Sequence, residues 1–141
     1  MVRDPYDTLL AEFNRRMSDN HTGLASQEEF QSKNWARFVE NQSKAWALFY
    51  DFYLENYNRR QLHILKYESL KNDLIFELRH LMNFLDIRMN QKVEDCVILK
   101  KDGTNKRKKV GLDLKQYFTP KQQEYIDIIK FETFSKLEQL E

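Results

Sequence analysis

One short segment, residues 61–67, has the pattern of a β-strand, and it constrains the fold more than any other feature of the chain. Three of its inner positions are apolar and polar residues border it on both sides, which is typical of a mostly buried strand. A lone strand leaves its backbone donors and acceptors unpaired, so it needs a neighbour. Residues 1–2 lead directly into Asp4-Pro5 and have the character of a strand end. We therefore expect the chain to begin inside an α/β sheet and to be a fragment of a larger domain.

The remaining sequence mostly has the spacing of amphipathic α-helices, in which apolar side chains recur every three or four residues. Glycine and proline rarely interrupt this spacing, because the 141 residues include three glycines and two prolines, whereas average usage of the two is roughly 12%. The fold class that we expect is therefore α/β, rich in long helices and with few strands. Helices are expected over residues 5–18, from 26 onward with a long helix at 33–57, and over 69–86, 90–99 and 120–137.

Capping residues predict where these helices begin. Asp4 precedes a proline at the first helical position, and Ser26 with Glu29 has the form of a capping box. Ser69 and Thr119 are expected to cap the helices over residues 69–86 and 120–137 in the same way.

Two helices are expected to place particular apolar side chains on one face. Aromatic residues from Trp35 to Tyr57 recur at steps of three, four and seven, which places them on one face of the long helix. In the helix over residues 90–99, Val93 and Val97 are expected to point inward.

Composition and motif searches exclude several classes of protein. With 23 Lys and Arg against 22 Asp and Glu, a net charge of +1, and 13% aromatic residues, the chain is neither a disordered polyelectrolyte nor a low-complexity protein. No run of about 18 uncharged apolar residues predicts a membrane span, and no signal peptide is evident. The single Cys96 excludes an internal disulfide, and the three histidines lack metal-site spacing, so we predict no metal. The scattered glycines do not form a complete phosphate-binding loop motif.

The densest charge feature is the basic loop, residues 100–109, which has six Lys and Arg and one Asp. Gly103 lies among its cations, and Lys106 and Arg107 follow, so backbone amides and side chains together suit a phosphate group. A solvated surface loop or a nonspecific nucleic-acid patch explains the same composition equally well.

Two further residues are candidates for binding an anionic ligand. Arg3 lies where a strand is expected to meet the start of a helix, a position that favours anions; the alternative is an ion pair with Asp4 or Asp7. Tyr67, followed by Glu68, lies at the carboxyl end of the expected strand, where open α/β sheets bind ligands. The alternative for Tyr67 is a residue at the edge of the core with its hydroxyl in water.

A series of short motifs runs along the chain in a fixed order. They are Val2-Arg3-Asp4-Pro5-Tyr6, residues 11–16, His21-Thr22-Gly23, Trp35 with Phe38-Val39, Lys66-Tyr67-Glu68-Ser69-Leu70, Phe84-Leu85, Cys96-Val97, the basic loop and Phe118-Thr119-Pro120. Taken together, they resemble those of sulfotransferases that use 3′-phosphoadenosine 5′-phosphosulfate (PAPS), in particular the WSC-domain-containing sulfotransferases. The resemblance implies an α/β domain of P-loop-NTPase type, of which residues 1–141 are the C-terminal part and from which the N-terminal phosphosulfate-binding loop is absent.

The resemblance also implies roles for the candidate residues. Arg3 would bind the 3′-phosphate of PAPS, the stretch from Gly103 through Lys106 and Arg107 would close over that phosphate and the adenosine, and Tyr67 would lie near the adenine. Ala11 departs from the pattern, because many sulfotransferases place a second phosphate-binding serine there.

The resemblance further implies an enzyme whose catalytic residues lie outside this chain, so the chain alone is expected to be inactive. The partners it implies are the nucleotide donor and a glycan acceptor bearing sialic acid, with no specific nucleic acid and no metal. Relatives of this kind are Golgi membrane proteins facing the lumen, held by an N-terminal anchor that this chain lacks. Two alternatives remain: a non-catalytic helical module, or a degenerate homologue, that binds polyanions through the basic loop.

Overall fold

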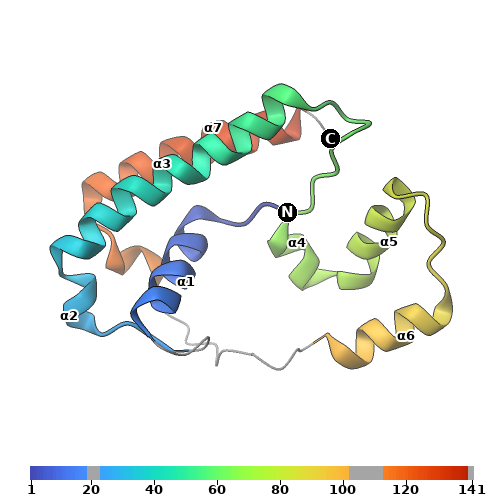
Figure 1. Cartoon of the computed structure of the whole chain (residues 1–141), viewed down its shortest axis with the longest axis horizontal. Helices are drawn as coiled ribbons and strands as arrows, with labels where there is room; N and C mark the ends of the chain where they lie inside the picture. The colour runs from blue at the N-terminus through green and yellow to red at the C-terminus, as the bar shows by residue number, and fades with distance from the viewer. Residues whose placement is uncertain (19–22, 102–112, 140–141) are drawn as a thin grey trace.

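The computed structural model describes residues 1–18, 23–101 and 113–139, and its secondary structure there is helical. Figure 1 shows α3 and α7 side by side, α1 next to them, and α4, α5 and α6 forming an arm on the other side of the N-terminus. The helices are α1 (Pro5–Met17), α2 (Gln27–Phe30), α3 (Lys33–Asn56), α4 (Tyr67–Asn72), α5 (Leu74–Phe84), α6 (Gln91–Lys100), the 3₁₀ helix η1 (Leu114–Tyr117) and α7 (Pro120–Glu138).

The predicted strand over residues 61–67 is wrong in extent. Only Lys66 pairs, in an isolated parallel bridge with Val2, and Tyr67 already begins α4. The Val2 amide donates to the Leu65 carbonyl and the Tyr67 amide donates to the Val2 carbonyl, both at 2.8 Å. The segment before α1 contributes Val2 alone to this pairing. No longer strand occurs within the described residues, although the pairing of the N-terminal segment with this one is present.

Most of the predicted helix starts are confirmed, with one exception. Asp4 accepts hydrogen bonds from the first-turn amides of α1, and capping boxes begin α2 at Ser26 and α7 at Thr119. The prediction that Ser69 caps a single helix over 69–86 is wrong, because Lys66 is the N-cap of α4. That helix is divided at Asp73, whose non-helical backbone and side-chain bond to the Phe76 amide end α4 and begin α5.

Aromatic rings form the larger of two hydrophobic clusters, between α1, α3 and the start of α7. The Phe13 ring centroid lies 4.7 Å from that of Trp35, and Trp35 also contacts the Phe118 ring at 5.1 Å. The Trp35 indole N–H donates to the Tyr117 carbonyl at 2.7 Å, which satisfies the polar atom of a buried ring. The buried members are Tyr6, Leu9, Leu10, Phe13, Trp35, Val39, Phe118 and Ile126.

The second cluster holds the N-terminal segment against the helices. Val2 packs there with Trp46 of α3 and with Ile129 and Leu137 of α7. Val2 is 2% exposed, so the residue that bridges to Lys66 is also anchored in the core.

One burial prediction is wrong, and the aromatic face of α3 is only partly buried. On this face, Trp35 and Trp46 are buried, whereas Phe49 and Tyr57 are exposed. In α6, Val93 is 40% exposed and Glu94 is buried instead, since Glu94 forms a bidentate ion pair with Arg79 of α5 at 2.8 Å. Val97 is half-buried.

Stability at low pH should depend on Glu12 of α1. Hydrogen bonds from Arg15 and Arg16 lower the pKa of Glu12 to about 2, so the fold favours its charged form. This contribution is present above the usual pKa near 4.5 and is lost as the pH falls from there toward 2. The melting temperature of the wild type should therefore fall more steeply than that of Glu12→Gln between pH 6 and pH 2.5. Parallel melting curves would contradict this, and the difference should be small because the arginines are exposed.

Candidate functional site

Arg3 and Tyr67 lie together at one end of the parallel bridge. Arg3 follows Val2 and Tyr67 follows Lys66, so both leave the bridge at its carboxyl side. The guanidinium carbon of Arg3 lies over the Tyr67 ring, 4.6 Å from its centroid. Two of the residues singled out in the sequence are thus brought into contact at the edge where α/β sheets bind ligands.

Hydrogen bonds from three helices hold the backbone beside Arg3. The Asp4 amide donates to the Glu68 carboxylate at 3.1 Å, which ties the start of α1 to α4. The Asp4 carboxylate caps α1 and also accepts from the Lys130 ammonium of α7 at 2.5 Å. The Tyr50 hydroxyl of α3 donates to the Met1 carbonyl at 3.2 Å, and burial raises the pKa of Tyr50, which keeps this donor neutral. The backbone at Arg3 is therefore firmly positioned.

The guanidinium of Arg3 is incompletely satisfied. Its Nε is buried and has no hydrogen-bond partner within the described ranges. The alternative ion pair with Asp7 exists, but the nitrogen and oxygen are 3.7 Å apart, which exceeds hydrogen-bond length. Arg3 therefore has donors left for an anionic ligand.

Lys71 is a residue of this site that we did not predict. Its ammonium lies 5.6 Å from the centroid of the Tyr67 ring, so two cations approach one aromatic side chain. Its position four residues after Tyr67 on a helix was a usable signal, but α4 was expected to begin only at Ser69.

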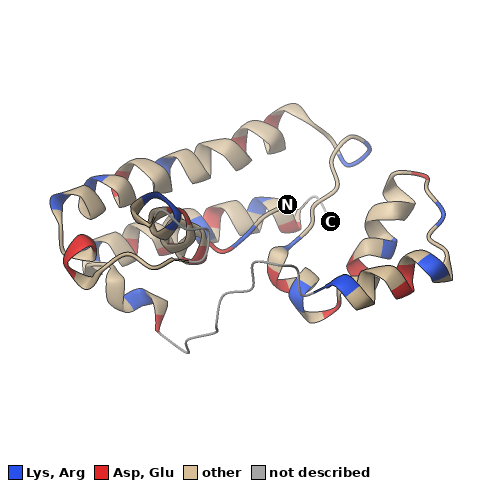
Figure 2. Ribbon diagram, turned by 60° about the horizontal axis from the view of Figure 1, so that its bottom comes forward, with Lys and Arg blue, Asp and Glu red and all other residues tan. Residues whose placement is uncertain are grey.

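The remaining predicted site residues are Gly103, Lys106 and Arg107, and they lie outside the described residues. Figure 2 shows Lys and Arg interspersed with Asp and Glu along the described helices. The polyanion-binding alternative rests on the basic loop, of which residues 102–109 lie outside the described residues. In the described part of the chain, no group of three or more His, Cys, Asp and Glu is placed to hold a metal ion, and no helix is long and apolar enough to span a membrane.

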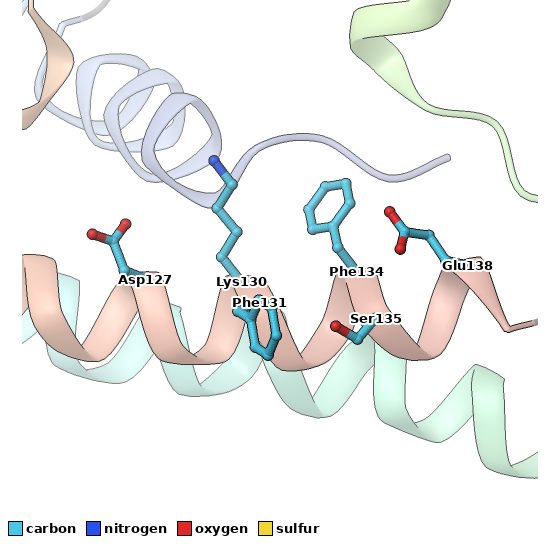
Figure 3. A pocket seen from close by; sticks show the side chains of 6 residues that line it. All are labelled: Asp127, Lys130, Phe131, Phe134, Ser135 and Glu138. Atoms are coloured by element: carbon cyan, nitrogen blue, oxygen red, sulfur yellow. The ribbon is translucent and has the colours of Figure 1, made fainter.

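A cavity of about 350 Å³ lies along α7 and is less suited to a ligand. Figure 3 shows its six lining side chains, all on this one helix, with Lys130 reaching toward the start of α1. Lys130 is already paired with the Asp4 carboxylate, so its ammonium helps to fix the chain beside Arg3 and is not free to bind a ligand in this cavity. The lining residues are Asp127, Lys130, Phe131, Phe134, Ser135 and Glu138.

Comparisons with known proteins identify the family. Residues 1–138 match the family model described as "Sulfotransferase domain". The WSCD family member CG9164 of Drosophila melanogaster is 32% identical over 120 residues, which are 83% of this chain and 37% of that protein. The WSCD family member AAEL009094 of Aedes aegypti is 30% identical over 140 residues, 97% of this chain and 43% of that protein.

The chain therefore spans less than half the length of these curated relatives. No solved structure matches it. The match over residues 1–138 confirms the resemblance that the motifs indicated: this chain belongs to the sulfotransferase domain family, and its relatives include WSCD family members.

Proposed function

We propose that this chain forms the donor-binding part of a sulfotransferase that uses PAPS. Arg3 would bind the 3′-phosphate and Tyr67 would lie beside the adenine. The observation that carries the proposal is the contact between a guanidinium with unused donors and an aromatic ring at the carboxyl side of a parallel pair.

Arg3 and Tyr67 together suit a nucleoside phosphate, Arg3 its phosphate and Tyr67 its base. An arginine binds a phosphate through two parallel hydrogen bonds, and an aromatic ring offers a face or edge to a base. The match to the sulfotransferase domain supports PAPS over other nucleotides. When bound, PAPS would supply the sulfuryl group that is transferred to an acceptor hydroxyl. We assign no general base to a residue of this chain, and Gly103, Lys106 and Arg107 are proposed to close over the phosphate.

The proposal also includes the type of sheet, the acceptor of the sulfuryl group and the location in the cell. The parallel direction of the Val2 and Lys66 pair is what a P-loop-NTPase-type sheet requires. A glycan acceptor bearing sialic acid, and a Golgi luminal location, follow the likeness to WSC-domain-containing sulfotransferases. The acceptor is tested by incubating the full-length protein with sulfur-labelled PAPS and glycoproteins, either untreated or treated beforehand with sialidase. Equal labelling of the sialidase-treated glycoproteins would contradict an acceptor that bears sialic acid.

The donor site is tested by calorimetric titration of the folded chain with 3′-phosphoadenosine 5′-phosphate (PAP). Adenosine 5′-monophosphate (AMP), which lacks the 3′-phosphate, is the control ligand. We expect PAP to bind at least about 10-fold more tightly, because one charge-assisted phosphate contact is worth about 1.5–3 kcal/mol. Equal binding of both nucleotides would refute the role of the 3′-phosphate. Competition by heparin with a steep salt dependence would favour the polyanion-binding alternative.

Asp7 should compete with the ligand for Arg3. Asp7→Asn removes the one carboxylate paired with the guanidinium among the described residues. We expect PAP to bind about 2- to 5-fold more tightly, because a partly exposed ion pair with a long nitrogen–oxygen distance contributes little free energy. Asp51→Asn, which breaks the pair with Lys136 elsewhere, is the matched change in charge. Weaker binding by Asp7→Asn in the same titration would mean that Asp7 holds Arg3 in place.

A further inference from the structure

Two positive side chains approach the Tyr67 ring from different parts of the chain. Arg3 comes from the segment before α1, and Lys71 comes from the last turn of α4. Their charged groups lie 4.6 and 5.6 Å from the same ring centroid. They are thus no more than roughly 10 Å apart, which is within about one screening length at 0.1 M salt.

Two carboxylates lie near these two cations, but neither forms an ion pair with Lys71. Asp7 lies 3.7 Å from Arg3, and the Glu68 carboxylate accepts a hydrogen bond from the Asp4 amide. Lys71 is exposed and makes no ion pair with any residue in the described part of the chain. Repulsion between two neighbouring cations costs free energy that a bound anion would relieve.

We propose that Lys71 is a second phosphate-binding residue of the donor site, which together with Arg3 contacts the anionic part of the nucleotide beside Tyr67. This inference rests on the function proposed above, and it adds to that site a residue outside the expected motifs. A local explanation competes with it: a lysine four residues after a tyrosine stabilises a helix by a few tenths of a kcal/mol without any ligand. The two explanations differ in what they predict for binding.

The test is titration of the Lys71→Gln chain with PAP and AMP, compared with Lys92→Gln. Lys92 is exposed on α6 and has no ion pair among the described residues, so its replacement removes the same charge away from the site. We expect Lys71→Gln to weaken PAP binding about 5- to 20-fold, since an exposed lysine contributes less than a buried one. Lys92→Gln should match the wild type, and Lys71→Arg should restore most of the affinity.

Each outcome is decisive. If the unmodified chain binds PAP and Lys71→Gln binds it as tightly as Lys92→Gln does, Lys71 does not contact the ligand, although the proposed function stands. If Lys71→Gln loses helical circular dichroism and weakens PAP and AMP equally, its role is structural and the proposal is refuted. If the folded wild type binds neither nucleotide, both the proposed function and this inference fail.

Discussion

Arg3→Ala is expected to weaken PAP binding by about 100-fold or more, the largest loss that any single substitution in this site should cause. The change removes a bidentate charge-assisted contact, and each such hydrogen bond is worth about 1.5–3 kcal/mol. AMP binding should change much less, because AMP lacks the phosphate that Arg3 is proposed to hold. Calorimetric titration of the folded variant with both nucleotides measures the difference.

Two further variants separate binding from folding. Arg3→Lys keeps the charge but not the planar fork, so we expect an intermediate loss of PAP affinity. Arg37→Ala removes an exposed arginine on α3 and should bind PAP as the wild type does. Equal, small losses for Arg3→Ala and Arg37→Ala would exclude a specific phosphate contact at Arg3.

The contact between Arg3 and Tyr67 is the part of the site that the sequence predicts best. Each residue follows a segment expected to be extended and directly precedes or begins a helix. When two extended segments pair in parallel, the residues that follow them lie at the same edge of the sheet, whatever other strands the sheet contains. Local signals thus identified the caps at Asp4, Ser26 and Thr119 and the junction at Arg3, whereas the binding roles of Arg3 and Tyr67 stay predictions.

The remaining features depend on partners that local sequence does not reveal. Residues 61–66 have strand character, but how many of them pair depends on the length of the neighbouring segment, which here offers Val2 alone. Phe49 and Tyr57 fit the helical stripe of α3, yet their exposure depends on which of its residues the other helices cover. Lys71 lies near the Tyr67 ring because α4 begins at Tyr67. That start directly follows Lys66, which is bridged to Val2, a residue 64 positions earlier in the chain.

The candidate site is also where the arm of α4, α5 and α6 meets the helices around the core. The Val2 bridge, the bond from the Asp4 amide to Glu68 and the Arg3 contact with Tyr67 all cross this junction. Figure 1 shows that the arm otherwise extends away from α3 and α7. A ligand held by Arg3 and Tyr67 would therefore contact both parts, and its affinity would depend on how well the core fixes the N-terminal segment.

Trp35→Ala is expected to cause the largest loss of stability, about 3–5 kcal/mol, which is typical of removing a buried tryptophan. Trp35 is 3% exposed and contacts the rings of Phe13 and Phe118, and its loss leaves the Tyr117 carbonyl without its partner. Because small domains are stable by only about 5–15 kcal/mol, the variant should be close to unfolding. Urea denaturation followed by circular dichroism at 222 nm measures the loss.

The matched control for this change lies on the same helix. Phe52 is an aromatic residue of α3 that is 54% exposed, so Phe52→Ala should cost less than about 1 kcal/mol. Trp35→Phe keeps a ring but removes the N–H donor, and we expect it to fall between the two. Similar midpoints for Trp35→Ala and Phe52→Ala would show that α3 is not packed on α1 through Trp35. The rigid core that the site needs behind Val2 and Arg3 would then have to come from the second cluster around Trp46.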